Sequence, residues 1–324
     1  MHDFGGAALT DAERYPVYKD RTLVLTLIGI GFLLVGAVAA FLGPYEIYCF
    51  YLFSEGGRFH YEGFKFGSLM FASIAWQVVG YYAIALLCIP LGYGHVRPRR
   101  WARVLMVSLL WCALILGLPL MVAFLFLLSV KDLSSTAGLL VVIALGLAYL
   151  TVPALLIRFY KSRDTRQTFE ARDERAYAIE RLPMPVLVLA LLFIFYVVFM
   201  HVPLFFNGIF PLFGVWLSDK QGFFALDVAI VSFVCLTWGV LRQRMWAWWG
   251  SVAYFGLLAV STVVTLARSS FAEILTSMQL PPTEMEMLKG VPLQGVHFVP
   301  FVGIPLLITL GVIVISRRHF VRQG

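Results

Sequence analysis

Charged side chains are scarce in this sequence of 324 residues. Asp, Glu, Lys and Arg make up 13% of the chain, whereas 60% of the residues are hydrophobic. An ordinary soluble domain has about 25% charged residues. So few charges cannot cover the surface of a water-soluble globule, and lipid is the solvent that tolerates such a surface. The composition excludes an ordinary soluble protein and predicts an all-α, polytopic membrane protein.

Motifs with a defined chemistry are also missing. The sequence contains no GxxxxGK[ST] loop, no GxGxxG, no HExxH and no GxSxG. The 4 cysteines form no CxxC pair, and the 6 histidines fall mostly in predicted loops or tails, which disfavours haem ligation. We therefore predict no catalytic residue, no cofactor-binding residue and no metal ligand, and we expect that the chain is not an enzyme.

Long apolar segments are what the sequence does contain. About 20 apolar residues cross the hydrocarbon core of a bilayer as a helix. Eight segments meet this length approximately, and the fourth is the weakest because only the short turn 130–134 separates it from the third. The predicted spans are 22–43, 68–92, 103–127, 136–157, 184–206, 223–241, 247–267 and 297–316.

The basic residues give these spans an orientation. With the N-terminus inside, the inner segments hold 19 of the 25 Lys and Arg residues and the outer segments hold 6. Cytoplasmic segments carry such an excess of Lys and Arg. Both termini are therefore predicted in the cytoplasm, in a cell membrane that we expect to be a bacterial plasma membrane. The basic residues that give the chain its net charge of +7 flank the spans. We therefore expect membrane lipids as partners and no nucleic acid.

This topology divides the chain into five parts. The linker between the two halves is rich in charge of both signs, and Ser162 or Asp164 in it is suited to cap a short helix on the inner leaflet. A solvated linker and a helix that docks a partner both remain open. The parts are an inner tail at 1–21, a four-helix half at 22–157, the linker at 158–183, a second four-helix half at 184–316 and an inner tail at 317–324.

The two halves look like copies of each other. The segment 88–92 (CIPLG) precedes the RWAR sequence at 100–103, and 235–239 (CLTWG) precedes MWAW at 245–248. Similarly, 52–55 (LFSE) in the first outer loop parallels 216–219 (WLSD) in the third. Four spans in each half would give both copies the same orientation, related by an axis along the membrane normal. The sequence therefore predicts two parallel repeats, although composition alone can also produce short Trp-Ala patterns.

The few polar side chains near or within the spans are the candidate site residues. A set of six falls at the outer ends of the second half, where a pair between Asp227 and Arg268 would satisfy both charges. This set is either an outward-facing pocket for a polar group or a structural cluster of interfacial charges. A long outer loop with an amphipathic helix near 271–280 could cover it. Gln77, inside the second span, is expected to make a polar contact between helices. The six residues are His201, Asn207, Asp227, Arg268, Glu273 and His297.

Three functional hypotheses follow, in this order. Spans almost free of charge favour an accessory, scaffold or assembly component that contacts lipid or other membrane protein subunits. The alternative is a transporter or binding protein for an apolar or amphipathic small molecule, supported by the two halves and by Gly-x-Pro steps at 117–119 and 303–305. A membrane enzyme that uses His201 or His297 as a base has no motif to support it.

Overall fold

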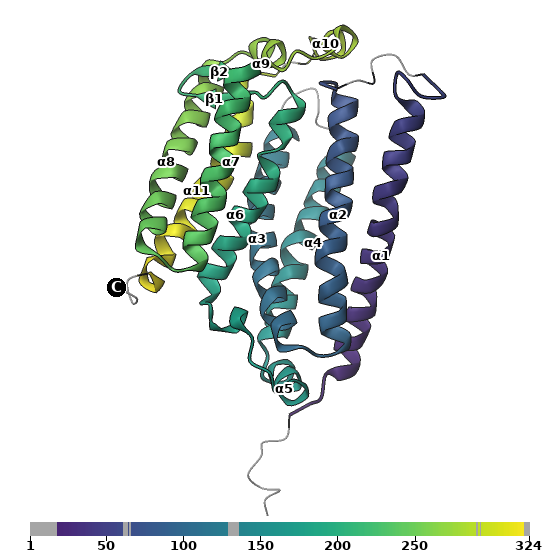
Figure 1. Cartoon of the computed structure of the whole chain (residues 1–324), viewed down its shortest axis with the longest axis vertical. Coiled ribbons are helices and arrows are strands. Elements are labelled where there is room, and N and C mark those ends of the chain that lie inside the picture. The colour runs from purple at the N-terminus through teal and green to yellow at the C-terminus, as the bar shows by residue number, and fades with distance from the viewer. Residues whose placement is uncertain are drawn as a thin grey trace, which may run out of the picture.

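The chain forms a bundle of long helices with a small cap at one end (Figure 1). The computed structural model describes residues 18–60, 64, 66–128, 136–289, 291 and 293–320, so the tails and the turn expected at 130–134 lie partly or wholly outside the described residues. The short helix α5 lies at one end, and α9 and α10 lie at the other. We call the end with α5 the inner end, following the charge distribution, and the opposite end the outer end.

The helices follow the expected order along the chain. Among the described residues they are α1 (Thr22–Phe53), α2 (Leu69–Val96), α3 (Arg100–Leu128), α4 (Thr136–Lys161), α5 (Arg163–Arg172), α6 (Met184–Phe199), α7 (Asp219–Leu241), α8 (Met245–Arg268), α9 (Phe271–Met278), α10 (Pro282–Lys289) and α11 (Gly295–Ser316). Short 3₁₀ helices are η2 (Ala178–Arg181), η3 (Val202–Phe205) and η4 (Arg317–His319), and the strands are β1 (Phe210–Leu212) and β2 (Val215–Leu217).

Seven helices in the described part of the chain are long and apolar enough to cross a membrane, namely α1, α2, α3, α6, α7, α8 and α11. The chain is therefore a helical membrane protein with several spans. The helix α4 covers the range expected for the fourth span, but many of its side chains lie outside the described residues.

Two predicted spans have different lengths in the structure. The helix α1 continues to Phe53 through Pro44, and its 32 residues extend over about 48 Å, longer than the hydrocarbon core. The predicted span 184–206 is instead interrupted, because α6 ends at Phe199 and the chain continues into η3. Pro203 explains this end, since a proline has no N–H to donate to the carbonyl four residues earlier, that of Phe199, and its ring clashes with that carbonyl.

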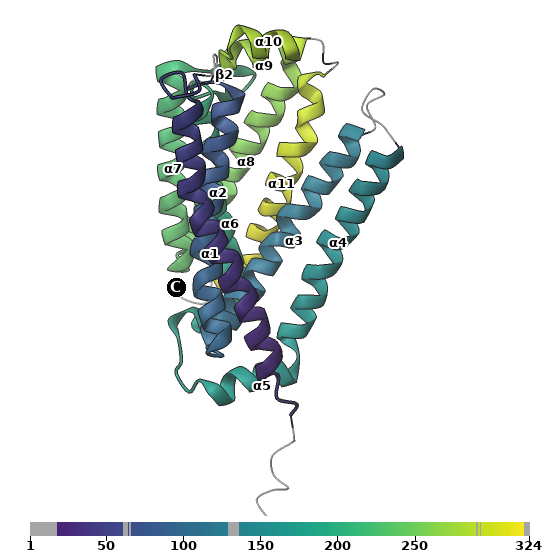
Figure 2. The same cartoon turned by 90° about the vertical axis from the view of Figure 1, so that its right-hand side faces the viewer.

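The helix α3 connects the two halves of the bundle. Its inner residues, such as Met106 and Val107, belong to a core that includes Tyr160 and Phe169 of the first half. Farther along, Cys112 belongs to the core of the second half, with Phe193 and others. Toward the outer end α3 and α4 diverge from α1 and α2 (Figure 2). The halves are therefore not independent bundles, because one helix contributes to both cores.

The cap at the outer end contains a β-hairpin that an all-α interpretation did not include. Strands β1 and β2 pair in antiparallel register, with Pro211 opposite Trp216. The two residues between the strands, Phe213 and Gly214, have φ of 45° and 98°. Positive φ at both loop residues matches the right-handed twist of the strands and is typical of a two-residue hairpin.

The helices α9 and α10 complete this cap. The expected amphipathic helix near 271–280 is present as α9, whose N-cap Ser270 and Glu273 form a capping box. In α10, Glu284 accepts hydrogen bonds from the backbone N–H groups of Leu69 (2.8 Å) and Met70 (3.4 Å), at the start of α2. A carboxylate satisfies the free N–H groups of a helix N-terminus and interacts favourably with its dipole. These hydrogen bonds thus connect the outer loop of the second half to the start of α2 in the first half.

The two inner turns of the halves have matching backbone hydrogen bonds. The N–H of Arg99 donates to the carbonyl of Gly94 (2.6 Å) between α2 and α3, and the N–H of Arg244 donates to the carbonyl of Gly239 (3.0 Å) between α7 and α8. The glycine and arginine are five residues apart in both turns.

Side-chain packing in these two turns is also alike. A Cβ atom at Gly94 would lie 2.5 Å from Cβ of Ala102, and one at Gly239 would lie 2.5 Å from Cβ of Ala247. In each turn the tryptophan before the alanine also lies against that turn's glycine, Trp101 against Gly94 and Trp246 against Gly239. The geometry therefore pairs Gly94 with Gly239, whereas the sequence comparison had placed Gly92 in that position.

The outer segments that looked parallel occupy different places. Ser54 follows the last residue of α1 as its C-cap. Ser218 precedes α7 as its N-cap. The segments 52–55 and 216–219 thus end one helix and begin another, so their similarity reflects composition rather than equivalent positions.

Candidate functional site

The hairpin is attached to α8 by a row of hydroxyl groups. The N–H groups of Phe213 and Gly214 donate to Ser261 Oγ (2.9 Å) and Thr265 Oγ1 (2.8 Å). Farther along, the indole Nε1–H of Trp216 donates to Ser269 Oγ (2.7 Å). The spacing of four residues places the three hydroxyls on one face of the helix. This spacing was visible in the sequence, but its meaning depended on recognising the hairpin.

An apolar cavity of about 560 Å³ lies beneath the hairpin. Its walls come from α3 and α4 of the first half and from α6, α7, α8 and α11 of the second, with the hairpin and η3 at the outer end. The lining residues are mainly aromatic and aliphatic, and none of them carries a formal charge. They are Ala113, Leu116, Tyr149, Phe195, Tyr196, Phe199, Met200, Pro203, Ile209, Phe210, Pro211, Trp216, Leu226, Leu258, Thr262, Leu266, Phe301, Val302, Pro305 and Leu306.

One wall of the cavity uses a Gly-x-Pro step in α11. Pro305 lies at the cavity, and its carbonyl accepts a hydrogen bond from the Tyr196 hydroxyl (3.3 Å). That hydroxyl also lies 2.9 Å from Thr309 Oγ1. The phenol of Tyr196 is thereby satisfied, and its ring presents an apolar face to the cavity.

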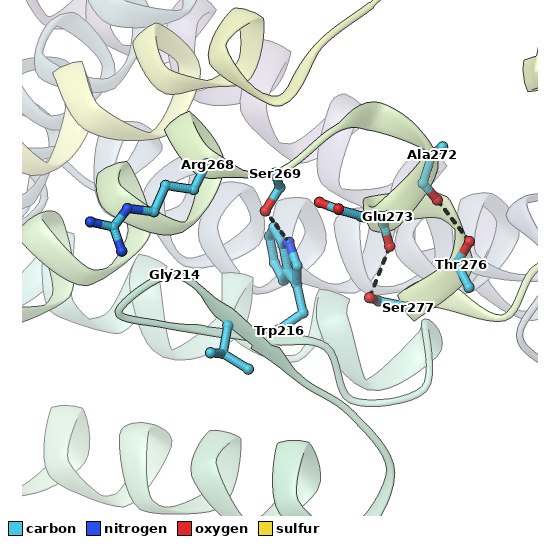
Figure 3. A pocket seen from close by; sticks show the side chains of 9 residues that line it. Gly214, Trp216, Arg268, Ser269, Ala272, Glu273, Thr276 and Ser277 are labelled. Atoms are coloured by element: carbon cyan, nitrogen blue, oxygen red, sulfur yellow. Dashed lines mark hydrogen bonds between the residues drawn. The ribbon is translucent and has the colours of Figure 1, made fainter.

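A second, polar hollow of about 570 Å³ lies on the outer surface next to the hairpin (Figure 3). Trp216 lines both this outer hollow and the apolar cavity. Arg268 is exposed, and its guanidinium passes close to the hairpin turn, since a Cβ at Gly214 would lie 3.4 Å from its Nη1. The carboxylate of Glu273, by contrast, already accepts a hydrogen bond from the backbone N–H of Ser270 (2.9 Å).

The structure brings two of the six predicted outer residues to one hollow. Arg268 and Glu273 both line the outer hollow, with the guanidinium and the carboxylate on either side of Ser269 in the view of Figure 3. His297 instead caps α11, with its Nδ1 accepting from the Gln294 N–H (2.9 Å). His201 is exposed at the end of α6 and contacts the Val197 carbonyl (2.7 Å).

The remaining predicted residues lie apart from the hollow. Asn207 adopts φ of 55° in a turn, and its carbonyl accepts from the Asp219 N–H (3.0 Å). Asp227 is on the exposed face of α7, and within the described residues it forms no ion pair with Arg268. Gln77 is also exposed and reaches Ser73 of its own helix (3.3 Å), so no contact between helices is recorded for it.

A buried polar cluster at the inner end was not predicted. His95 is fully buried, with Nδ1 2.7 Å from the Leu91 carbonyl and Nε2 2.7 Å from the Tyr160 hydroxyl. Phe169 of α5 packs against the same imidazole. The cluster holds α5 against α2 and α4. The sequence assigned His95 to a loop because the predicted span ended at 92.

The linker carries a second part of this inner cluster. Asp173 is buried, and its carboxylate accepts from the Arg99 side chain (3.2 Å) and the Arg100 N–H (3.1 Å). Burial raises the pKa of Asp173, but hydrogen bonds from Arg100, Tyr177, Arg175 and Arg99 outweigh it, so its pKa lies below the ordinary value of 3.8. The charged linker thus docks on the turn between α2 and α3, and Ser162 caps α5 as expected.

The described residues contain no group of three or more His, Cys, Asp or Glu side chains that could hold a metal ion. The site is therefore characterised by an apolar cavity, a polar hollow and the indole between them. No protein family model matches the sequence, and no curated protein or solved structure matches the chain.

Proposed function

We propose that the chain binds an apolar or amphipathic small molecule within the membrane. The observation that carries this proposal is the apolar cavity between α3 of the first half and α6, α8 and α11 of the second. Its volume is within the range of about 300–1,000 Å³ that is common for small-molecule sites. The absence of charged lining residues favours an apolar chain over an ion or a polar metabolite.

The proposal includes a topology of eight spans with both termini in the cytoplasm of a bacterial cell. The excess of Lys and Arg at the inner end supports this orientation. The matching inner turns support an origin of the two halves by duplication, with both copies in the same orientation. In this arrangement the hairpin, α9 and α10 face the outside, and the cavity lies in the outer part of the bilayer.

A photoreactive probe tests the binding proposal. Purified protein in nanodiscs would be labelled with an uncharged diazirine derivative of hexadecanol, and the labelled peptides would be mapped by mass spectrometry. We expect labelling at 195–200 of α6 and 301–306 of α11. Uniform labelling of the exposed faces of α1 and α7, with none at these segments, would contradict the proposal.

Two neighbouring residues of α8 provide a matched pair of variants. Leu258 lines the cavity and is buried, whereas the adjacent Leu257 is 60% exposed and is not part of the cavity lining. Leu258→Trp adds volume inside the cavity and should remove most of the labelling. Leu257→Trp adds the same volume on the lipid side and should leave the labelling unchanged.

A scaffold or accessory role is a second candidate, favoured by a different observation. Asp227 lies on the exposed face of α7 beside Phe224 and Val228, which are 71% and 50% exposed. An ionised carboxylate that faces lipid is costly, so such residues usually have a partner. A membrane subunit with a Lys or Arg at that depth would provide one. Loss of a co-purifying subunit in Asp227→Asn, but not in Asp219→Asn at the helix end, would support this role.

A further inference from the structure

The apolar cavity and the outer hollow share one wall, the indole of Trp216. The indole is fixed on one side by its hydrogen bond to Ser269 Oγ (2.7 Å). Ser269 in turn donates to the Thr265 carbonyl (2.7 Å). Trp216 is therefore the residue that the apolar cavity and the polar hollow have in common.

The outer hollow offers one cation that is not already paired. Within the described residues Arg268 forms no ion pair, and its guanidinium is exposed beside the hairpin turn. The neighbouring carboxylate of Glu273 caps α9 and lies on the other side of Ser269 from the guanidinium in the view of Figure 3. The hydroxyls of Thr276 and Ser277 donate to helix carbonyls, so they are not the main donors for a ligand. A guanidinium presents a rigid fork of N–H donors that fits a carboxylate or phosphate.

We propose that the ligand of the cavity is an anionic amphiphile with a single chain. The anionic group lies on Arg268 in the outer hollow, and the chain enters the apolar cavity past Trp216. Trp216 lines both the cavity and the hollow, so a ligand that passes its ring would reach both spaces. This inference rests on the proposed binding function and adds the class of ligand and its direction of binding.

Three probes with the same chain separate this inference from the proposed function. The diazirine derivatives of hexadecanol, hexadecanoic acid and hexadecyl phosphate differ only in the polar group. We expect both anions to label the cavity segments at lower concentration than the alcohol does. Preference for the acid or for the phosphate would distinguish a fatty acid from a phospholipid-like ligand. If no probe labels the cavity, the binding function itself fails. If all three label it equally, only the anionic class fails.

Substitution of Arg268 tests the headgroup contact. Arg268→Gln should weaken the labelling by both anions about tenfold, as expected for the loss of a charge-assisted hydrogen bond. It should leave labelling by the alcohol unchanged. Arg58→Gln removes another exposed cation of the outer side, in the first half, and should have no effect. Equal labelling of Arg268→Gln and the wild type by the anions would overturn the assignment.

Two further variants test the position of Trp216. Ser269→Ala and Trp216→Phe remove opposite partners of the same hydrogen bond and keep a ring between the two spaces. Both should increase the rate at which the anionic probes label the cavity. Unchanged rates in both variants, with folding verified by their melting temperatures, would overturn the path past Trp216.

Discussion

The turn between α2 and α3 and the turn between α7 and α8 share a backbone hydrogen bond and a glycine–alanine contact but have different surroundings. In the first half the linker covers the turn, and Asp173 and Glu180 pair with Arg99 and Arg100. In the second half no linker is present. Arg242 lies over an aromatic ring instead, 5.7 Å from the ring centroid of Trp238. The shared backbone hydrogen bond therefore forms in both charge environments.

The same contrast extends to the opposite ends of the bundle. The inner end of the first half is closed by the fully buried side chains of His95, Tyr160 and Phe169. The outer end of the second half contains the apolar cavity and the outer hollow. One region holds the helices together, and the other leaves space between them. The proposed binding function uses the second region, since a ligand needs a space that the protein has not filled.

Replacement of the two turn glycines should have the largest effect. Gly94→Ala and Gly239→Ala each place a Cβ about 2.5 Å from the Cβ of a buried alanine. We expect each to cost about 1–3 kcal/mol of stability, as overpacking of a core does. The two losses should be similar if the turns are equivalent. Melting temperatures in mild detergent would measure them.

The matched controls for the glycines are in the same chain. Ala102→Gly should partly restore Gly94→Ala, and Ala247→Gly should partly restore Gly239→Ala, because each removes the atom in the collision. Gly31→Ala in α1 meets no atom within 4 Å and should be tolerated. Destabilisation by only one of the turn variants would show that the turns are not equivalent.

Removal of Asp173 should have the next largest effect, and only the first turn should respond. Asp173→Ala leaves the Arg100 N–H at the start of α3 without its acceptor and Arg99 without its partner. We expect the melting temperature to fall by several degrees and trypsin to cleave the linker more rapidly. Glu174→Ala, at an exposed neighbouring position, should behave like the wild type.

Lowering the pH should reduce the stabilisation that the Asp173 carboxylate provides. The pKa of Asp173 is lowered in the folded chain from its ordinary value of 3.8. Its stabilising effect is therefore present above pH 3.8 and is lost as the pH falls through the lower, folded pKa. The difference in melting temperature between the wild type and Asp173→Ala should be constant from pH 7 to about 4. It should shrink below that pH, and a difference that persists in stronger acid would contradict the role of the ionised carboxylate.

Replacement of Arg99 and Arg244, which occupy equivalent positions in the two turns, should have the smallest effect on stability. Arg99 pairs with Asp173, whereas Arg244 is exposed and, within the described residues, has no ion pair. Arg99→Gln should lower the melting temperature by less than Asp173→Ala does, because the Arg100 N–H keeps its bond. Arg244→Gln should cause no measurable change. A loss in Arg244→Gln as large as that in Arg99→Gln would remove the difference between the turns.

Parts of the candidate site were accessible from sequence, because they depend on local patterns. The repeat of apolar residues beginning at Phe271 identified α9, and Ser162, the N-cap of α5, was one of the two residues predicted to cap it. Arg268 and Glu273 were expected near each other because they border the same outer loop. The hairpin was missed since each of its strands has only three residues, too few to give an alternating pattern.

Contacts between distant segments could not be anticipated. Glu284 and Leu69 are 215 residues apart, and no local rule assigns the carboxylate of one loop to the N-terminus of a helix in the other half. His95 and Tyr160 are 65 residues apart, and their contact depends on how α2 and α4 meet. The pair expected between Asp227 and Arg268 did not form because the exposed face of α7 carries Asp227 away from the outer hollow.

The sequence by itself determined that the chain is a helical membrane protein, because the length of an apolar segment and the cost of placing charges in lipid are local properties. Only the tertiary structure decided where space remains. The cavity exists because α3 packs with both halves and the hairpin covers the gap beneath Trp216. Packing depends on the relative positions of several helices, and a single sequence does not contain those positions in a form that local rules can recover.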